Sequence, residues 1–297
     1  MSLLSFSQRV IAGTAGTVEW QQVGANGEPA DPGTVTVTVT RADGTVLVSD
    51  AATGGTGTDP RTWSLSVANS ATLDRLTVAW EASGVTLATT EVDVVAAPWF
   101  SNAELRAAEK SVSDSTKFTA DRITTARLQV ESFFEQVTRR RFVPGYAMVW
   151  LRGNPSHDLV LPHPDLRTVR SAGLYDDPSS TPVETLTAGE VGAIPPSPAG
   201  VATRYSGTWL ARWVRIGFEW GFVAPSPEVK RQAMRLCREV LVNDPSGQIP
   251  DNASSWSSTE LGWSAVLVTP GVRGAHTRLP SVNKCLDDWT FAEVGIA

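Results

Sequence analysis

The sequence is poor in the residues that carry most metal and nucleophilic chemistry. Its 297 residues include only 2 Cys and 3 His. Cys237 and Cys285 lie far apart and have no CxxC or Cys/His neighbour, which is typical of free thiols in a reducing compartment. His157, His163 and His276 lack the spacing of metal ligands. We therefore expect neither a metal nor a cofactor in this chain.

Long apolar runs and processing signals are missing as well. No apolar stretch approaches the ~20 residues of a membrane span, and the start, MSLLSFSQRVIAG, lacks the basic region and apolar core of a signal peptide. The sequence thus predicts a soluble chain, made in a cytoplasm, with no membrane partner. The net charge of −6 argues against general binding to phosphate backbones, so any contact with nucleic acid would be local.

Catalytic motifs are incomplete throughout the chain. The loop GGTGTDP (Gly54–Pro60) lacks the lysine and hydroxyl residue that end a phosphate-binding loop. SVNK (Ser281–Lys284) lacks the partner motifs SDN and KTG. We predict that the chain is not an enzyme, and the alternative in that class is a hydrolase that uses Asp158 or His163.

Tryptophan is abundant, with 11 Trp against 3 Tyr. Its side chain is large, carries one polar N–H group, and is enriched at the energetic centres of interfaces. The same side chain also fills hydrophobic cores. The sequence leaves both uses open.

Residues 1–97 have the pattern of β-strands throughout. TVTVTVT (Thr34–Thr40) alternates strictly, so its valines face one side and its threonines the other. ADGT (Ala42–Thr45) carries the Asp-Gly pair of a tight hairpin, and LTVAW (Leu76–Trp80) alternates again. Six or seven short strands without a helical period predict a small antiparallel β-sandwich, which resembles immunoglobulin-like modules in architecture.

The pattern becomes helical after the linker AAPW (Ala96–Trp99). Ser101 and Glu104 fit a capping box, and Thr119 is an N-cap before apolar residues at helical spacing. Cys237 lies on the apolar stripe of a later helix, where a small core residue is expected. The predicted helices span 101–112, 120–141, 227–243 and 282–290.

A strand-rich segment, 146–224, interrupts these helices, and YAMVWLR and RWVRIGFEWGF are its clearest strands. A C-terminal arm follows at 245–297. Its polar part around Trp256 and Trp263 either docks on a partner or folds back on its own domain. We predict an α+β chain with an immunoglobulin-like β-sandwich at 1–97 and a second domain at 98–297, made of a small helical bundle, a β-rich insertion and an extended C-terminal arm.

Three consecutive arginines follow two phenylalanines in VESFFEQVTRRRF. Cations in the last turn of a helix complement its dipole, by about 0.3–1 kcal/mol each when exposed. A nucleic-acid site would need more basic residues on the same face, whereas this helix also carries Glu131 and Glu135. We interpret Arg139, Arg140 and Arg141 as structural, or as donors of bidentate salt bridges to a neighbouring subunit.

Four segments within residues 101–290 resemble the head-to-tail connector (adaptor) proteins of long-tailed double-stranded DNA phages. They are ARLQVESFFEQVTRRRF, LVLPHPDLRTVRSA, WGFVAPSPEVKRQAMRLCREVL and LPSVNKCLDDW, and they follow in the family's order. Each segment is degenerate alone, so their order carries the resemblance. The N-terminal β-domain, the large insertion and the tryptophan-bearing arm depart from the family.

The resemblance implies a structural protein of the virion, an adaptor that forms a homo-oligomeric ring, dodecameric in the family, under the portal at the head-tail neck. Its partners would be the portal protein, the stopper or tail-completion protein, and passing double-stranded DNA without sequence specificity. The β-domain would face outward, toward the major capsid protein. An acidic ring would let DNA slide, and contacts repeated around one axis would add up to a stable collar. For the subunit or portal interface we predict Arg139, Arg140, Arg141, Trp256, Trp263, Trp289 and Phe291.

The alternative function is a surface- or carbohydrate-binding β-sandwich, suggested by Trp20, Trp63 and Trp80. These tryptophans are in phase with the apolar faces of their strands, which favours burial. We therefore place the structural adaptor first and the binding module second.

Overall fold

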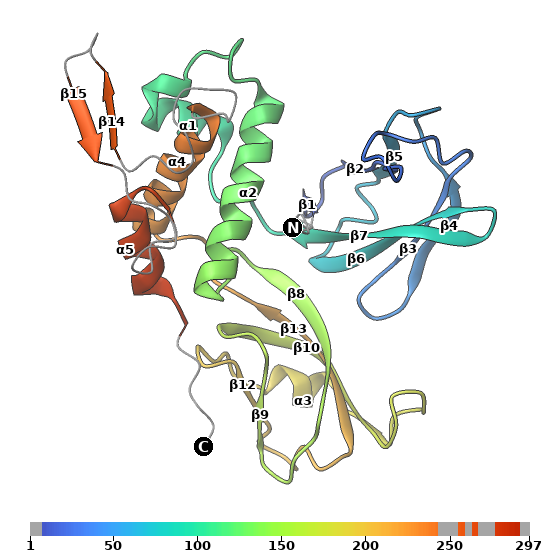
Figure 1. Ribbon diagram of the computed structural model, residues 1–297. Helices are drawn as coiled ribbons and strands as arrows, with labels where there is room; N and C mark the ends of the chain where they lie inside the picture. Colours follow the sequence, from blue (N-terminus) through green and yellow to red (C-terminus); the bar gives the residue numbers. More distant parts are fainter. Residues whose placement is uncertain (1–7, 243–254, 259–262, 267–276, 292–297) are drawn as a thin grey trace. The chain divides into compact units, whose positions relative to one another are not determined.

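The computed structural model describes residues 8–242, 255–258, 263–266 and 277–291 (Figure 1). Within these residues the chain is mixed α+β, with five α-helices, one short 3-10 helix and strands in several sheets. It divides into two compact units, Met1–Pro98 with Val143–Val223 and Trp99–Phe142 with Ala224–Ala297. The first unit therefore joins the N-terminal strands to the β-rich segment, while the domain boundary at 97/98 stays a prediction.

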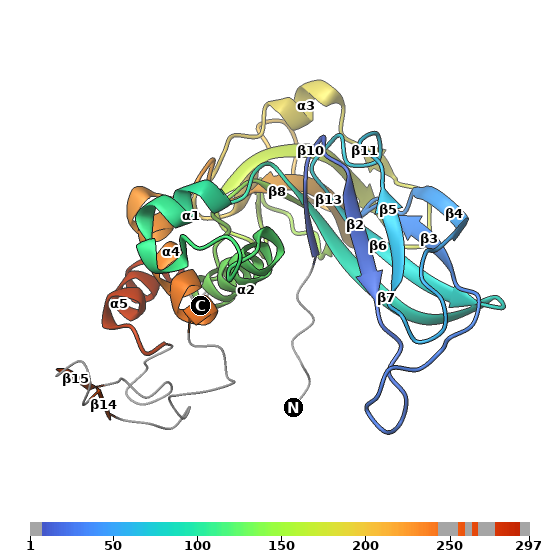
Figure 2. The ribbon, with the colours of Figure 1, turned by 90° about the horizontal axis from the view of Figure 1, so that it is seen from above.

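The N-terminal strands form two sheets that share one core (Figure 2). The larger sheet has the order β1-β7-β6-β3-β4, and β2 pairs with β5 in the smaller one. In β3, Val37 and Val39 are buried between half-buried threonines, as the alternation predicts. The strands are β1 (Gln8–Ile11), β2 (Gly16–Trp20), β3 (Thr36–Thr40), β4 (Val46–Ala52), β5 (Arg61–Leu65), β6 (Asp74–Ala82) and β7 (Val85–Val95).

The predicted Asp-Gly hairpin joins β3 to β4. Gly44 has a φ of 87°, which favours glycine, and the carboxylate of Asp43 accepts a hydrogen bond from the backbone N–H of Thr45 at 2.8 Å. This turn fixes the register in which Val39 pairs with Val48. The hairpin prediction is therefore confirmed.

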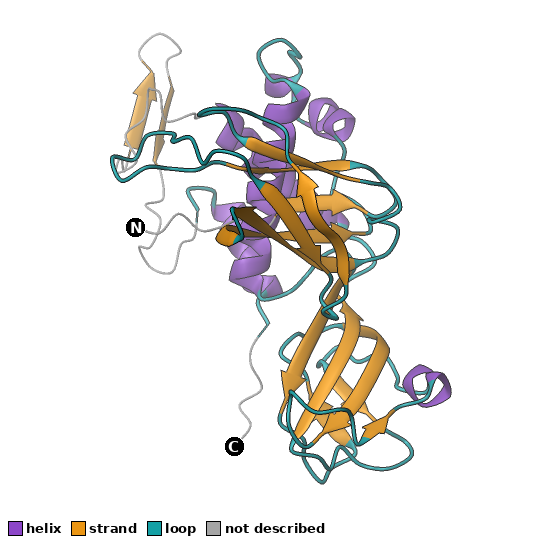
Figure 3. Ribbon diagram, turned by 90° about the vertical axis from the view of Figure 1, so that its right-hand side faces the viewer, coloured by secondary structure: helices purple, strands orange, loops and turns teal. Residues whose placement is uncertain are grey.

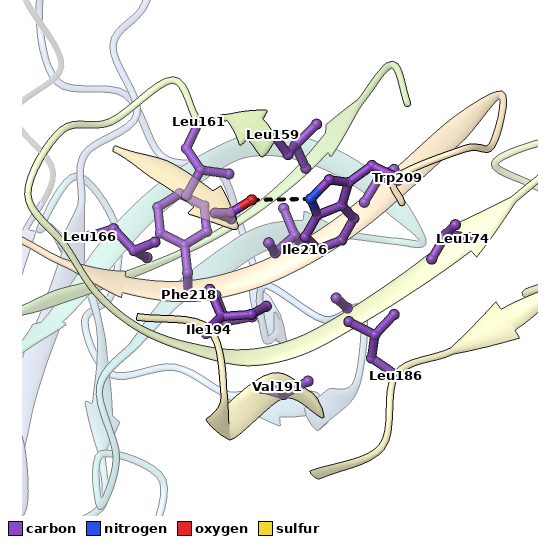
Figure 4. Close-up of a cluster of buried hydrophobic side chains, with 14 of the residues drawn as sticks. Leu159, Leu161, Leu166, Leu174, Leu186, Val191, Ile194, Trp209, Ile216 and Phe218 are labelled. Carbon is purple, nitrogen blue, oxygen red and sulfur yellow. Dashed lines mark hydrogen bonds between the residues drawn. The ribbon is translucent and has the colours of Figure 1, made fainter. Parts of the chain in front are cut away.

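The β-rich segment builds a four-stranded antiparallel sheet with the order β11-β10-β13-β8. Its inner face packs on a core that includes Leu159, Trp209, Ile216 and Phe218 (Figure 4). The short helix α3 (Ala188–Gly192) covers part of this core through Val191. The strands are β8 (Gly145–Leu151), β9 (Asp158–Val160), β10 (Leu166–Tyr175), β11 (Glu184–Thr185), β12 (Val201–Thr203) and β13 (Trp213–Trp220).

The remaining helices pack together in the second unit (Figure 3). The N-caps predicted at Ser101 and Thr119 are confirmed, because both hydroxyl oxygens accept a hydrogen bond from the backbone of the first helical turn. The predicted helix 101–112 is broken at Glu109, where the backbone leaves helical angles. The helices are α1 (Asn102–Ala108), η1 (Lys110–Val112), α2 (Ala120–Thr138), α4 (Pro227–Val242) and α5 (Pro280–Trp289).

Two short strands lie in the predicted C-terminal arm. β14 (Ser255–Ser258) and β15 (Trp263–Val266) pair antiparallel, with Trp256 opposite Ala265 and Ser258 opposite Trp263. This backbone pairing was not predicted, because the Ser-rich sequence shows little alternation. The tryptophan side chains of these strands are outside the part of the chain that the structure describes.

Candidate subunit interface

The predicted arginine cluster lies at the C-terminal end of α2. This helix ends at Thr138, so the prediction of a helix over 120–141, with the arginines in its last turn, is wrong. Arg139 adopts left-handed backbone angles, with φ 55° and ψ 24°, which end the helix. The hydroxyl of Thr138 also donates to the carbonyl oxygen of Phe134 at 2.7 Å, which competes with further helical bonding.

The chain that follows α5 closes this end of α2. The backbone N–H of Phe291 donates to the carbonyl oxygen of Thr138 at 2.8 Å, and so satisfies one of the carbonyls that a helix end leaves unpaired. The guanidinium of Arg140 lies over the Phe291 ring, 5.6 Å from its centroid. The two chain segments that make up the second unit, Trp99–Phe142 and Ala224–Ala297, therefore meet at this helix end.

A row of aromatic rings lies beside this helix end. The ring centroid of Trp99 is 5.7 Å from that of Phe134 and 5.0 Å from that of Phe142, both edge-on. Phe142 in turn meets Trp289 edge-on at 5.6 Å. Such pairs stabilise by about 0.5–1.5 kcal/mol beyond the burial of their surface. Three of the rings are buried, whereas Trp289 is half-buried and leaves part of its indole uncovered.

A buried carboxylate holds the backbone of Trp99, one of the inner rings of this row. Glu131 is 1% exposed, and its Oε1 accepts a hydrogen bond from the backbone N–H of Trp99 at 3.0 Å. Arg127 lies one helical turn earlier, with its Nε 3.6 Å from the same oxygen and its Nη1 donating to the carbonyl of Phe100. Removing one partner of such a buried pair would leave an uncompensated charge in the core. The pair therefore helps to fix the backbone at Trp99, where the chain enters the second unit.

The structure brings five of the seven predicted interface residues to this end of the second unit, where Arg139 is exposed, Arg140, Trp289 and Phe291 are half-buried, and Arg141 is buried. The other two, Trp256 and Trp263, have no described side chains. A role between subunits stays a prediction for all seven.

Sequence reasoning missed Trp99. We assigned it to a linker, yet its side chain is only 2% exposed and forms the centre of the aromatic row. The signal that could have found it is the apolar pair Trp99-Phe100 immediately before the N-cap Ser101. A hydrophobic residue at that place often packs back on the helix that follows.

Of the three tryptophans predicted to be buried in the N-terminal strands, Trp63 and Trp80 are buried, whereas Trp20 is half-buried. Trp80 is 0% exposed and Trp63 is 7% exposed, and Trp20 stacks on Trp80 with ring centroids 5.8 Å apart. A sugar-binding platform needs exposed ring faces, so these indoles do not support the carbohydrate-binding alternative.

The two residues considered for a hydrolase each contact other side chains. His163 stacks on the ring of Trp220 at 4.1 Å, and the carboxylate of Asp158 accepts from the hydroxyl of Thr203 at 2.6 Å. Among the described residues, no group of three or more His, Cys, Asp and Glu side chains could hold a metal ion.

No described helix is long and apolar enough to cross a membrane.

Both cysteines are free and buried, as predicted. Burial raises the pKa of the Cys237 thiol to about 12 and that of Cys285 to about 11. Both thiols therefore stay protonated near neutral pH, and they act as small core residues of α4 and α5.

No protein-family model matches the chain, and no curated protein matches it. Among solved structures, the chain is similar to one in the neck of a native GTA particle computed with C12 symmetry, at 13% identity and a TM-score of 0.38, over 66% of this chain and 90% of that chain. A chain in the neck of an empty GTA particle computed with C6 symmetry is similar at 16% identity and a TM-score of 0.34, over 43% of this chain and 71% of that chain. A chain of the ZIG-8–RIG-5 IG1-IG1 heterodimer is similar at 14% identity and a TM-score of 0.23, over 32% of this chain and 89% of that chain. Similarities this low carry no argument about the fold or the function of this chain.

Proposed function

We propose that this chain is a structural protein of a phage-like particle, a head-to-tail adaptor that forms a ring under the portal at the neck. The observation that supports it is the meeting of two connector-like segments, far apart in sequence, in one helical unit. VESFFEQVTRRRF ends α2, and LPSVNKCLDDW forms α5. Phe142 meets Trp289, and Phe291 binds the end of α2, so two of the four segments that carry the resemblance pack together at this helix end.

The composition of this surface suits a contact with another protein. Trp, Phe and Arg side chains are large, and they supply much of the binding energy where interfaces have been measured. Trp289 and Phe291 are only half-buried, and Arg139 is exposed beside them. A neighbouring subunit or the portal would cover the remaining ring area, while Arg139 would bind a carboxylate of that partner.

The partners follow from the adaptor role. The ring would be a homo-oligomer, a dodecamer in the proposal, that binds the portal protein on one side and the stopper or tail-completion protein on the other. Double-stranded DNA would pass through it without sequence recognition. The N-terminal β-domain would face the major capsid protein.

The helical unit, which would form the wall of the ring, is nearly neutral and not acidic as expected from the net charge of the chain. Residues 99–142 and 224–297, which make the helical unit, carry 15 Lys and Arg against 14 Asp and Glu, whereas residues 1–98 carry 4 against 10. A nearly neutral wall still lacks the cation excess that would trap phosphates. DNA would therefore pass freely because the positive and negative charges of the helical unit nearly balance. The excess of acidic residues lies in the β-domain.

The test is deletion of the gene in the particle that encodes it. The proposal expects heads that package DNA but carry no tails, and rescue when the wild-type chain is supplied in trans. The variant Arg139→Glu should rescue less well than Lys284→Glu, which makes the same charge change at an exposed lysine of α5 outside the predicted interface residues. Complete tailed particles in the absence of the chain would refute the adaptor role.

A further inference from the structure

A hollow of about 460 Å³ opens on the four-stranded sheet of the first unit, outside the helical surface described above. Leu174 forms its floor on β10, and the loop between β12 and β13 forms one wall with Gly207 and Leu210. Glu184 on β11 and Glu190 on α3 line the hollow as well. No part of the mechanism proposed so far uses this hollow.

Hydrogen bonds hold the loop at the hollow in one conformation. The indole Nε1 of Trp209 donates to the carbonyl oxygen of His157 at 2.9 Å and to that of Ala202 at 3.0 Å, and the ring is fully buried. Figure 4 shows one of these hydrogen bonds as a dashed line. The guanidinium of Arg204 donates to the carbonyl of Thr208 at 2.7 Å. The loop is therefore pre-organised, which lowers the entropic cost of binding a partner.

Leu210 lines the hollow and is open to solvent, and the exposed residues Tyr205 and Val183 are next in sequence to the lining residues Arg204 and Glu184. Of the four most exposed large hydrophobic residues in the described chain, three lie on or next to its lining: Tyr205 at 74%, Leu210 at 70% and Val183 at 69%. The backbone N–H of Val183 is bound to the carbonyl of Leu174, so this residue is held at the edge of the sheet. Gathered exposed apolar groups around a concave centre are typical of a contact site.

The centre of the hollow has an excess of carboxylate. Arg204 is buried, with its Nη2 2.7 Å from the Oε1 of Glu184 and 3.9 Å from that of Glu190. One guanidinium thus faces two carboxylates, and both glutamate side chains are partly exposed. The whole first unit repeats this imbalance, with 17 Asp and Glu against 10 Lys and Arg. A basic group flanked by apolar surface is the complementary partner.

The helical unit presents such a basic group on α4. Arg231 and Arg235 are exposed and one helical turn apart. Within the part of the chain that the structure describes, Arg231 forms no ion pair or hydrogen bond through its side chain, and Arg235 reaches only the hydroxyl of Ser281, at 3.4 Å. The next arginine, Arg238, is already paired with Glu109 at 3.7 Å. The first two arginines are therefore available to a carboxylate from outside.

We infer that the hollow lined by Leu210, Glu184 and Glu190 docks the Arg231–Arg235 face of α4 from a second copy of this chain. The contact joins two different surfaces, so each copy can bind one neighbour through its hollow and another through α4. The inference deepens the proposed ring by naming a contact between neighbours, and it rests on that proposal only for its biological setting.

Sedimentation velocity of the full chain tests this contact. The rim variant is Tyr205→Ser with Leu210→Ser, and the helix variant is Arg231→Glu with Arg235→Glu. All four side chains are exposed, so both variants should keep the melting temperature of the wild type. The matched control is Val223→Ser, which removes an equally exposed hydrophobic residue that does not line the hollow.

The wild type and the control should associate, and association should weaken as salt shortens the range of charge interactions from about 30 Å at 0.01 M to about 3 Å at 1 M. Each variant alone should sediment as a monomer. An equal mixture of the two variants should form dimers and nothing larger, because the pair retains one intact hollow that can meet one intact helix face.

The contact is refuted if the wild type stays monomeric throughout the salt series, if either variant associates like the wild type, or if the mixture of variants stays monomeric. None of these outcomes touches the adaptor role, which is measured by tail attachment in the deletion experiment. If the deletion abolishes tail attachment while either variant associates like the wild type, the adaptor role stands and the contact is refuted.

Discussion

At the residue scale, Phe142 is the side chain on which the aromatic row depends. It is fully buried and touches both Trp99 and Trp289. We expect Phe142→Ala to lower the free energy of unfolding by about 3–5 kcal/mol, because it removes buried area and leaves a cavity. Phe133→Ala is the control, since this ring is only half-buried, and its effect should be clearly smaller in denaturant unfolding. Equal effects would show that the row does not stabilise the unit.

The two cysteines give a second prediction at this scale. The raised pKa values, about 12 for Cys237 and about 11 for Cys285, keep the reactive thiolate scarce at mildly alkaline pH. A disulfide reagent should therefore label neither thiol in the folded chain and both thiols in denaturant. Rapid labelling of the native protein would contradict their burial.

At the scale of elements, the end of α2 depends on one residue with left-handed angles. Arg139 has a φ of 55°, a conformation that glycine adopts without the steric cost of a Cβ atom. We expect Arg139→Gly to be more stable than Arg139→Ala by about 1 kcal/mol, in thermal or denaturant unfolding. Both variants lose the guanidinium, so their difference reports the backbone alone. If alanine is the more stable, the helix does not end in this conformation.

An ion pair between α1 and α4 predicts a pH dependence. The hydrogen bond from Lys230, together with the backbone N–H of Ser101, lowers the pKa of Glu104 from 4.5 to about 2. A lowered pKa means that the carboxylate stabilises the fold above about pH 4.5, and that this stabilisation is lost as the pH falls toward 2. The side chain is half exposed, so we expect about 0.2–1 kcal/mol.

The comparison of the wild type with Glu104→Gln measures this pair. Their unfolding free energies should differ near neutral pH and converge in acid. A difference that stays constant down to pH 2 would assign the effect to the capping box rather than to ionisation.

Local patterns predicted the elements whose signals are local. Strict alternation located β3, and side-chain caps located the starts of α1 and α2. β1 was missed because it has four residues and is held by parallel pairing with β7, at the far end of the sandwich sequence. α3 was missed because five residues are too few to show a helical period, although Thr187 and Glu190 have the spacing of a capping box.

The candidate site was only partly predictable for the same reason. The arginines and Trp289 were identifiable by residue type, but their neighbours depend on contacts between distant segments. Phe291 binds Thr138 although the whole β-rich segment lies between them in the sequence. Trp99 binds Glu131 although it belongs to a stretch with the composition of a linker. The end of α2 was misplaced because an arginine in left-handed conformation has no sequence signature.

At the scale of the whole molecule, charge is distributed unevenly between the two units. The first carries 17 acidic and 10 basic side chains, and the second carries 14 and 15. In the sandwich, Arg41, Arg61 and Arg75 are each paired with a carboxylate of the same sandwich. Glu28 and Asp59 are exposed, and residues 1–98 carry 10 acidic against 4 basic side chains, so the N-terminal strands present a negative surface.

The central claim is that copies of this chain encircle the channel through which DNA leaves the head. An image reconstruction of the particle neck tests it most directly. The account predicts a ring of copies directly beneath the portal, with the α2 end, Trp289 and Phe291 covered by a neighbouring subunit or by the portal. A particle that lacks the chain at the neck, or that carries single copies away from the channel, would contradict it.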